Sequence, residues 1–321
     1  QAEQWMKSIL GANAAFRDGQ WDAIEALVQR RQRVLVVQRT GWGKSIVYFL
    51  ATRLLRQQKQ GATILISPLL SLMGNQIAIA QQWGLKAASI DSTNPDEHKT
   101  IESQLLNNQL DLLLISPERL ANERFQDKVW SRIRRKVGLM VIDEAHCISD
   151  WGHVFRPNYR RIMSILDDLP VGTPVLATTA TANDRVVEEV SEIVGTGMNI
   201  LRGALTRESL RLYVYREPLD TATRLTLLSH LMNSLSGSGI IYCTTTRDCQ
   251  QVADWLQQEG HNVKPYYAQV EEDYNVTREE LEQGLLNNQY KALAASVALG
   301  MGFDKPDLHF VIHFQKPGNI I

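Results

Sequence analysis

The sequence predicts an α/β protein of two lobes, each a parallel β-sheet with helices on both faces. Short runs of β-branched residues and leucine recur along the chain, and between them apolar residues recur at helical spacing, which is the pattern of βαβ units. The 321 residues suffice for about two domains. A short polar segment, Thr206–Ser209, separates two such series, so we expect lobes at residues 1–205 and 206–321.

The elements of the first lobe are predicted from apolar runs that are short enough to be buried strands. These runs are Val34–Val37, Ala62–Ile66, Leu110–Ile115, Leu139–Ile142, Val175–Thr179 and Ile200–Leu201. Helices are expected between them, for example over Ser45–Leu55 and Arg185–Val194. The second lobe continues the alternation, with strands expected at Leu212–Tyr215, Gly239–Cys243, Val263–Tyr267, Ala292–Ala295 and Phe310–Phe314 and with helices expected over Arg224–Met232, Asp248–Gln258 and Arg278–Leu286.

Composition excludes several classes of protein. Hydrophobic residues make up 44% of the chain and charged residues 21%, as in folded globular domains. No apolar run approaches the roughly 18 residues of a membrane span, and the first residues lack a signal-peptide core. The three cysteines form no Cys-x-x-Cys pair, which argues against a zinc cluster and favours reduced thiols in the cytoplasm. The first residue is Gln1 rather than Met, so we expect the chain to be part of a longer protein.

A phosphate-binding loop is predicted directly after the first strand, where a glycine-bearing turn leads into Lys-Ser at a helix start. Backbone N–H groups of such a turn face phosphates, the lysine neutralises their charge, and the serine hydroxyl binds Mg²⁺. The usual pattern has a glycine six positions before the lysine, where this chain has Gln38, and Trp42 is bulky for such a loop. The alternative is a strand–turn–helix with a solvated lysine. The loop residues are Thr40, Gly41, Trp42, Gly43, Lys44 and Ser45.

Two adjacent carboxylates, Asp143 and Glu144, follow the apolar run Leu139–Ile142. A buried strand that ends in Asp-Glu is how ATP-hydrolysing enzymes with a phosphate loop hold Mg²⁺ and orient the attacking water. We therefore expect Asp143 and Ser45 to bind Mg²⁺ and Glu144 to act on the water, although a solvated pair at a strand end has the same sequence. His146 is expected to couple this site to other motifs or to satisfy a local backbone group.

An aromatic loop follows within a few residues, with Trp151, Phe155 and Arg156 on a polar, glycine-containing segment. Aromatic faces stack on nucleic-acid bases and arginine contacts phosphates. Alternatively, the two aromatic residues anchor the loop in a core. An ATP-hydrolysing strand joined to a nucleic-acid-contacting loop predicts a motor that spends ATP on a nucleic-acid strand. The net charge of −1 gives no overall basic surface, so such contacts must come from locally placed cations.

With these motifs in place, the chain resembles the RecQ family of superfamily-two DNA helicases, and QRTGWGKS together with ISDWGH is similar to its RqlH branch. The loop departs from the family pattern at Asp150 and Val154. The resemblance implies two RecA-like lobes with ATP between them. It also implies that the aromatic loop senses single-stranded DNA. The residues that it assigns to adenine recognition are Phe16, Arg17 and Gln20, those for contact with DNA are Ser67, Ser71, Arg119 and Ser296, and those of a late motif that faces ATP include Gly302 and Asp304.

The resemblance implies a 3′-to-5′ DNA helicase that uses ATP and Mg²⁺, binds single-stranded and duplex DNA, and serves DNA repair and recombination. The paired arginines of the family's last motif are expected to follow Ile321. Two alternatives stay open. One is a nucleic-acid-binding scaffold with a degenerate nucleotide site, motivated by Gln38, by Trp42 and by the absence of the paired arginines before Ile321. The other is an RNA-remodelling ATPase, because such enzymes share the Asp-Glu-Ala-His signature.

Overall fold

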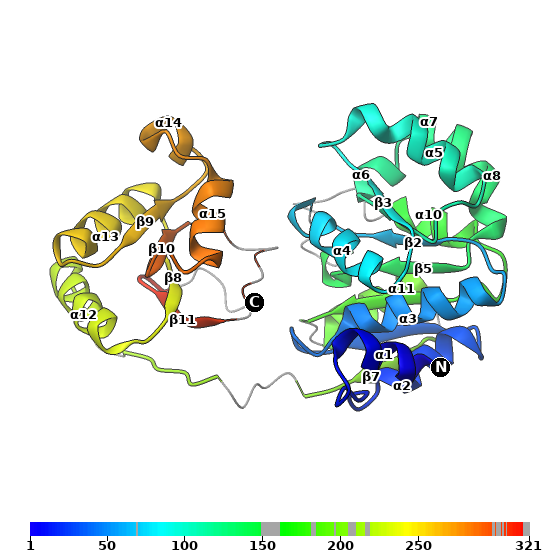
Figure 1. Ribbon diagram of the computed structural model, residues 1–321, viewed down its shortest axis with the longest axis horizontal. Helices are drawn as coiled ribbons and strands as arrows, with labels where there is room; N and C mark the ends of the chain where they lie inside the picture. Colours follow the sequence, from blue (N-terminus) through cyan, green and yellow to red (C-terminus); the bar gives the residue numbers. More distant parts are fainter. Residues whose placement is uncertain are drawn as a thin grey trace. The chain divides into compact units, whose positions relative to one another are not determined.

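The computed structural model describes residues 1–68, 70–148, 161–180, 184–195, 197–204, 210–215 and 219–296, together with Leu299, Phe303, Lys305 and residues 307–316. The chain divides into two compact units, Gln1–Leu210 and Arg211–Ile321 (Figure 1). The boundary expected between residues 205 and 206 falls on residues outside the described ranges, and it remains a proposal.

Unit 1 is built on a parallel sheet of seven strands in the order β3-β4-β2-β5-β6-β1-β7. The strands are β1 (Arg33–Val37), β2 (Thr63–Ile66), β3 (Ala87–Ile90), β4 (Leu112–Ile115), β5 (Leu139–Ile142), β6 (Val175–Thr179) and β7 (Asn199–Arg202). All but β3 were predicted from the sequence. The strand β3 was missed because Ala87–Ile90 is an edge strand and has only one fully buried residue.

Helices cover both faces of this sheet (Figure 1). They are α1 (Ala2–Leu10), α2 (Gln20–Val28), α3 (Lys44–Gln57), α4 (Leu70–Gln82), α5 (His98–Leu106), α6 (Pro117–Leu120), α7 (Glu123–Phe125), α8 (Ser131–Ile133), α10 (Arg161–Asp167) and α11 (Asp184–Val194). Short 3₁₀ turns are η1 (Pro95–Glu97), η3 (Arg134–Lys136) and η4 (Ala145–Ile148), and η2 (Gln126–Trp130) is a π turn.

The two faces of the sheet bury separate cores, because side chains alternate along each strand. In β1, Leu35 and Val37 join the core that includes α5, α10 and α11, while Val34 and Val36 join the core that includes α1, α2 and α3. Unit 1 is therefore a three-layer α/β structure, as the alternation of apolar runs predicts.

Unit 2 has a parallel sheet of four strands in the order β11-β8-β10-β9. Its strands are β8 (Ser238–Tyr242), β9 (Val263–Tyr266), β10 (Ala292–Ala295) and β11 (Leu308–His313), and its helices are α12 (Thr221–Ser234), α13 (Thr246–Gln258), α14 (Val270–Tyr274) and α15 (Arg278–Leu286). The α15 helix begins with a capping box in which Thr277 and Glu280 each accept a hydrogen bond from the other's backbone N–H.

One strand expected in this unit is wrong. Residues Leu212–Tyr215 alternate in the manner of a strand, yet they form no strand in the structure. Leu212 and Tyr213 are each 82% exposed, so neither face of the segment is buried. An alternating segment becomes a strand only when a neighbouring strand accepts its backbone hydrogen bonds, and the sequence pattern contains no information about that neighbour.

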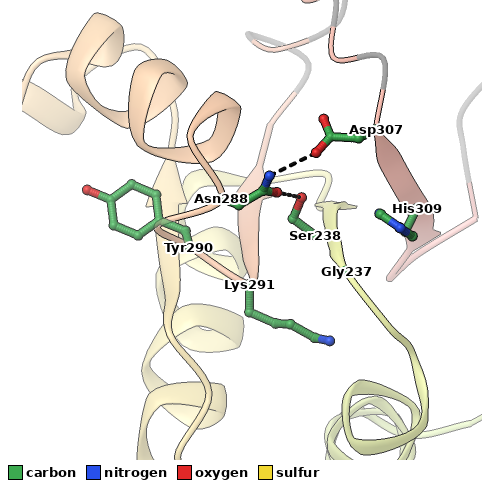
Figure 2. Close-up of a pocket in the computed structure, with 7 residues that line it drawn as sticks. All are labelled: Gly237, Ser238, Asn288, Tyr290, Lys291, Asp307 and His309. Carbon is green, nitrogen blue, oxygen red and sulfur yellow. Dashed lines mark hydrogen bonds between the residues drawn. The ribbon is translucent and has the colours of Figure 1, made fainter.

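A cluster of polar groups ties together the beginnings of β8 and β11 and the turn before β10, around a cavity of about 410 Å³. Figure 2 shows the Asn288 amide between Asp307 and Ser238. Its Nδ2 donates to Asp307 at 2.8 Å, and its Oδ1 accepts from Ser238 Oγ at 2.7 Å. The buried Lys305 ammonium donates to the same Oδ1 at 2.9 Å and to Asp307 at 2.7 Å. These groups satisfy one another, so the cluster holds the fold of unit 2 together.

Candidate active site

The candidate site of unit 1 lies at the edge of the sheet where β2, β5, β6 and β1 end. These four strands are neighbours and run parallel, so the segments that follow them meet at one edge. In open parallel sheets this edge is the usual place for ligands. The segments there carry Ser67, Asp143, Thr179 and the loop that starts at Gln38.

The loop after β1 has the backbone geometry of a phosphate cradle. Gly41 and Gly43 have φ values of 78° and 93°, in the left-handed region that glycine adopts without strain. The 14-residue helix α3 starts at Lys44 and has no side-chain cap, and an uncapped helix N-terminus of this kind favours an anion. Lys44 Nζ donates to the Gln38 carbonyl at 3.0 Å. Burial lowers the pKa of Lys44, and the carboxylates of Glu144 and Asp143 oppose that shift.

The bulky Trp42 does not fill the loop. Its side chain is only 6% exposed and packs into the core beneath α2 and α3. Gln20 fixes the backbone at this point, since its Nε2 donates to the Trp42 carbonyl at 2.9 Å and its Oε1 accepts from the Arg17 N–H at 2.8 Å. The Arg17 guanidinium also donates to the carbonyl of Gly41. The segment expected to recognise adenine is thus in direct contact with the phosphate loop.

Gln38 occupies the position where the usual loop has glycine, and it is 8% exposed. It fits because Gly203, just after β7, lies against it. A Cβ on Gly203 would lie 2.3 Å from both polar atoms of the Gln38 amide. The Gln38 side chain therefore lies beside the end of β7. Gly41 and Gly43 still form the left-handed turn, although Gln38 stands where the usual loop has glycine.

Asp143 is a buried carboxylate held by donors from three segments. Its Oδ1 accepts from Thr178 Oγ1 at 2.6 Å and from the Glu144 N–H at 3.1 Å, and its Oδ2 accepts from Gln76 Nε2 at 3.1 Å. Burial raises the pKa of Asp143, as does the nearby charge of Glu144, whereas the Thr178 hydrogen bond and Lys44 lower it. These donors fix the orientation of the carboxylate at the end of β5.

Glu144 and His146 lie beside this carboxylate. Glu144 has φ = 50°, an uncommon conformation for a residue with a side chain and one often found at functional sites. His146 Nδ1 lies 3.3 Å from Glu144 Oε2 and 3.1 Å from Thr179 Oγ1. Burial works against the charged imidazole, but hydrogen bonds with Cys147 and Glu144 prevail and raise the pKa of His146 to about 10. His146 therefore links the end of β5 to the end of β6.

Three residues of this site were not anticipated from the sequence: Gln76, Thr178 and Tyr48. Gln76 donates both to Asp143 and to the hydroxyl of the fully buried Tyr48, at 3.2 Å. Its own Oε1 is buried and has no hydrogen-bond partner among the described residues. Helical spacing in the sequence could have indicated that Gln76 is buried. It follows the buried Met73 by three residues and so lies on the apolar face of α4.

The residues expected to contact DNA lie in several places. Ser67 is buried after β2, and Arg119 lies in the short helix α6, where its N–H donates to Ser116 Oγ at 3.3 Å. Ser71 lies in α4, and its side chain is outside the described part of the structure. Ser296 follows β10 in unit 2, and its N–H donates to the Tyr266 carbonyl at 3.0 Å. The predicted residues that lie outside the described ranges are Trp151, Phe155, Arg156, Gly302 and Asp304.

The remaining predicted residues lie near the phosphate loop. The Phe16 ring contacts the Trp21 ring, with centroids 5.4 Å apart. Thr40 is exposed on the loop, and Ser45 is the second residue of α3. The structure thus brings together Arg17, Gln20, Lys44, Asp143 and His146 with their immediate neighbours in one unit.

This fold and this arrangement of motifs define a nucleotide-dependent helicase core. The chain belongs to the DEAD/DEAH box helicase family, whose model matches residues 17–190, and a model of the helicase conserved C-terminal domain matches residues 223–321.

Among curated proteins, the chain is 34% identical over 316 residues to a putative ATP-dependent DNA helicase Q1 of Caenorhabditis briggsae, which covers 95% of this chain and 49% of that protein. It is 33% identical over 321 residues to the ATP-dependent DNA helicase RecQ of Haemophilus influenzae, covering 98% of this chain and 49% of the relative. The resemblance to RecQ helicases is therefore confirmed. The chain spans about half the length of these relatives.

Solved structures of other proteins share the fold. Saccharomyces cerevisiae Dbp5 bound to RNA and ADP BeF3 has a TM-score of 0.74 at 17% identity and covers 99% of this chain and 79% of that one. The DUF1998 helicase MrfA bound to DNA and AMPPNP has a TM-score of 0.75 at 19% identity, covering 98% of this chain and 46% of that one. These likenesses confirm two RecA-like α/β lobes.

Proposed function

We propose that this chain is the motor core of an ATP-dependent DNA helicase that moves 3′ to 5′ along a single strand and separates duplex DNA. The observation that carries the proposal is the phosphate-cradle loop of Lys44 beside the buried carboxylate of Asp143, at one edge of the first sheet. Similarity to proteins named DNA helicases over nearly the whole chain supports DNA as the nucleic acid.

ATP would bind with its phosphates against the N-terminus of α3. Lys44 would neutralise charge on the β- and γ-phosphates, because its ammonium already lies at the loop. Gln20 would contact adenine. Its Oε1 has a second acceptor position, and the hydrogen bond that its Nε2 donates to the Gly43 carbonyl is long at 3.4 Å, so the amide retains capacity for a base. The same amide holds the Trp42 carbonyl, which would connect base recognition to the loop.

The donor set at Asp143 fits a divalent cation. A carboxylate has about four acceptor positions, and the described residues fill two on Oδ1 and one on Oδ2. Oδ2 therefore keeps one position, and Ser45 supplies a hydroxyl at the start of α3. These two residues would hold Mg²⁺. When bound, the ion would polarise the phosphate oxygens and offset their charge.

Glu144 would orient the attacking water and accept its proton, since its carboxylate lies next to Asp143. His146 would hold Glu144 in place and link this site to Thr179 at the end of β6.

The DNA backbone would be contacted, without recognition of its sequence, by Ser67, Ser71, Arg119 and Ser296. Trp151, Phe155 and Arg156 would stack on bases and contact phosphate, which would gate hydrolysis. Gly302 and Asp304 would face the nucleotide.

Two of the sequence arguments for the scaffold alternative, Gln38 and Trp42, lose their force. Trp42 packs into the core and Gln38 lies against Gly203, so neither obstructs the turn at Gly41–Gly43.

Three free cysteines support a reducing compartment such as the cytoplasm. Among the described residues, no helix is both long and apolar enough to cross a membrane.

The proposal is tested by measuring ATP hydrolysis by the full-length protein with and without single-stranded DNA. We expect DNA to stimulate turnover and Lys44→Ala to abolish it, because the phosphate charge would lose its lysine. Lys86→Ala, which removes an exposed lysine of the same unit, serves as the control and should leave turnover unchanged. If Lys44→Ala hydrolyses ATP as fast as the wild type, the assignment of this site is rejected. If the wild type hydrolyses no ATP with or without DNA, a scaffold is favoured. If RNA stimulates hydrolysis and DNA does not, an RNA-remodelling enzyme is favoured.

A further inference from the structure

A second pocket of unit 1, about 380 Å³ in volume, is strongly basic. The described residues that line it include no carboxylate, but they include five cations: Arg31, Lys59, Arg132, Arg135 and Lys136. The whole chain has a net charge of −1, so this is a local concentration of positive charge. Four of the five, all except Arg31, are exposed. No ion pair or side-chain hydrogen bond involves those four within the described part of the chain.

The pocket is distinct from the nucleotide site because it lies at the opposite edge of the sheet. Its walls are the segments just before β1, β2, β5 and β6, whereas the nucleotide site follows the ends of the same strands. A strand of four or five residues separates the two edges by roughly 15 Å. Its base is rigid. Gly61 and Gly138 bring the chain before β2 against the chain before β5, since a Cβ on Gly61 would lie 1.6 Å from the Lys136 carbonyl oxygen.

Arg31 is the cation whose guanidinium is held by hydrogen bonds, and it is partly buried. Its backbone is left-handed, with φ = 53°. Its Nε donates to the Gly172 carbonyl at 3.2 Å, and its Nη2 donates to Gln60 Oε1 at 3.3 Å. Its Nη1 is buried and has no hydrogen-bond partner among the described residues. The two hydrogen bonds fix the guanidinium at the wall of the pocket, so its positive charge has a defined position there.

We infer that this basic pocket is a phosphate-binding site, with Arg31 as a cation fixed in its wall and Arg132, Arg135 and Lys136 as exposed cations that bind the ligand. Arginine binds phosphate through paired N–H groups, and several cations around one cavity match a group that carries two negative charges. The phosphate would come either from a DNA backbone or from a small phosphate ester. Both present the same chemistry to the pocket.

The test uses the full-length protein with its nucleotide site saturated by a non-hydrolysable ATP analogue, so that only further sites are measured. Pyrophosphate is titrated by calorimetry, and a short DNA duplex is titrated by fluorescence anisotropy over a range of salt concentrations. Arg135→Glu should weaken binding of at least one probe about tenfold or more, because an attraction becomes a repulsion. For the duplex, the salt dependence should also become shallower by about one unit.

The matched control is Arg134→Glu. Arg134 is the neighbouring residue, but it pairs with Asp168 at 2.8 Å and does not line the pocket, so both affinities should stay near wild type. Arg31→Ala tests the cation fixed in the wall independently. If the pocket variants lose only the binding of pyrophosphate, the ligand of the pocket is a small phosphate ester. If they lose the binding of the duplex, the ligand is the DNA backbone. Unchanged affinity for both probes in Arg135→Glu and Arg31→Ala, or a loss equally large in Arg134→Glu, would overturn the inference.

Discussion

Asp143 shows how much of the candidate site depends on one buried side chain. Its carboxylate ends strand β5 and accepts hydrogen bonds from Thr178, Gln76 and the backbone of Glu144. Burying a charge is costly unless donors surround it. The three donors lower that cost and fix the orientation of the carboxylate. Gln76 is the one donor that comes from a helix, and that helix starts within the segment expected to contact DNA.

Gln76 is therefore expected to act as a positioning residue for Asp143. In Gln76→Leu, a side chain of similar size would lack the donor, and Asp143 would lose one of its charge-assisted hydrogen bonds. Such bonds contribute about 1.5–3 kcal/mol, so we expect kcat for DNA-stimulated ATP hydrolysis to fall about tenfold or more. The KM for ATP should change little, since Lys44 and the loop are untouched.

Gln82→Ala provides the control for this prediction, because Gln82 is an exposed glutamine at the end of the same helix. Steady-state kinetics and thermal unfolding are measured on both variants. A loss of kcat with an unchanged melting temperature supports the positioning role. If kcat and the melting temperature fall together, or if KM alone rises, Gln76 supports the fold or the binding of ATP rather than Asp143.

At the scale of elements, the phosphate loop and strand β7 are adapted to each other. The loop carries glutamine where the usual pattern has glycine, and the strand is followed by a glycine that leaves room for it. Gly203 donates its N–H to the Val37 carbonyl at 3.1 Å, so its backbone is fixed beside the loop. The Gln38 side chain thus occupies the space that a side chain at position 203 would fill.

This adaptation predicts that Gly203→Ala weakens ATP binding, because the new methyl group would collide with the buried Gln38 amide. Overpacking of this kind costs about 1–3 kcal/mol. Part of that cost should appear as a lower melting temperature and part as a weaker affinity for ATP. The double variant Gln38→Gly with Gly203→Ala removes the collision and should recover both quantities. If the double variant is no better than Gly203→Ala alone, the two positions are independent.

At the scale of the whole molecule, the chain consists of two units that each have their own sheet and core. The family models divide it in the same way, with one match in each unit. In the proposed motor, DNA binding must alter hydrolysis, so a residue that serves as the link should affect that coupling more than it affects binding.

Trp151 is the predicted residue for this role, from the aromatic loop that follows Glu144 in the sequence. In Trp151→Ala we expect the stimulation of ATP hydrolysis by single-stranded DNA to fall several-fold, while DNA affinity falls less. Hydrolysis without DNA should be unchanged and serves as the internal control. Stimulation is measured at saturating DNA, and affinity is measured by anisotropy. Equal losses of stimulation and affinity would mean that Trp151 only binds DNA.

The sequence was most informative where local chemistry decides the structure. Apolar runs in the sequence predicted the buried strands. The Lys44 loop and the Asp143–Glu144 pair each follow one of these strands, so the loop and the pair lie at the same edge of a parallel sheet. It failed where the outcome depends on a partner distant in the chain. The alternation at Leu212–Tyr215 did not give a strand, and β3 formed at the sheet edge without a strong apolar signal.

The sequence alone determined the alternation of strands and helices, the division into two α/β units and the order of the chemical motifs, because each depends on residue type and short-range spacing. The tertiary structure decided how these residues are supported. Only folding brings Gln76 to Asp143 and Gly203 to Gln38. Only folding places five cations around one pocket and holds the Arg31 guanidinium against Gly172 and Gln60. These relations join segments far apart in the chain, and no local pattern in the sequence specifies such distances.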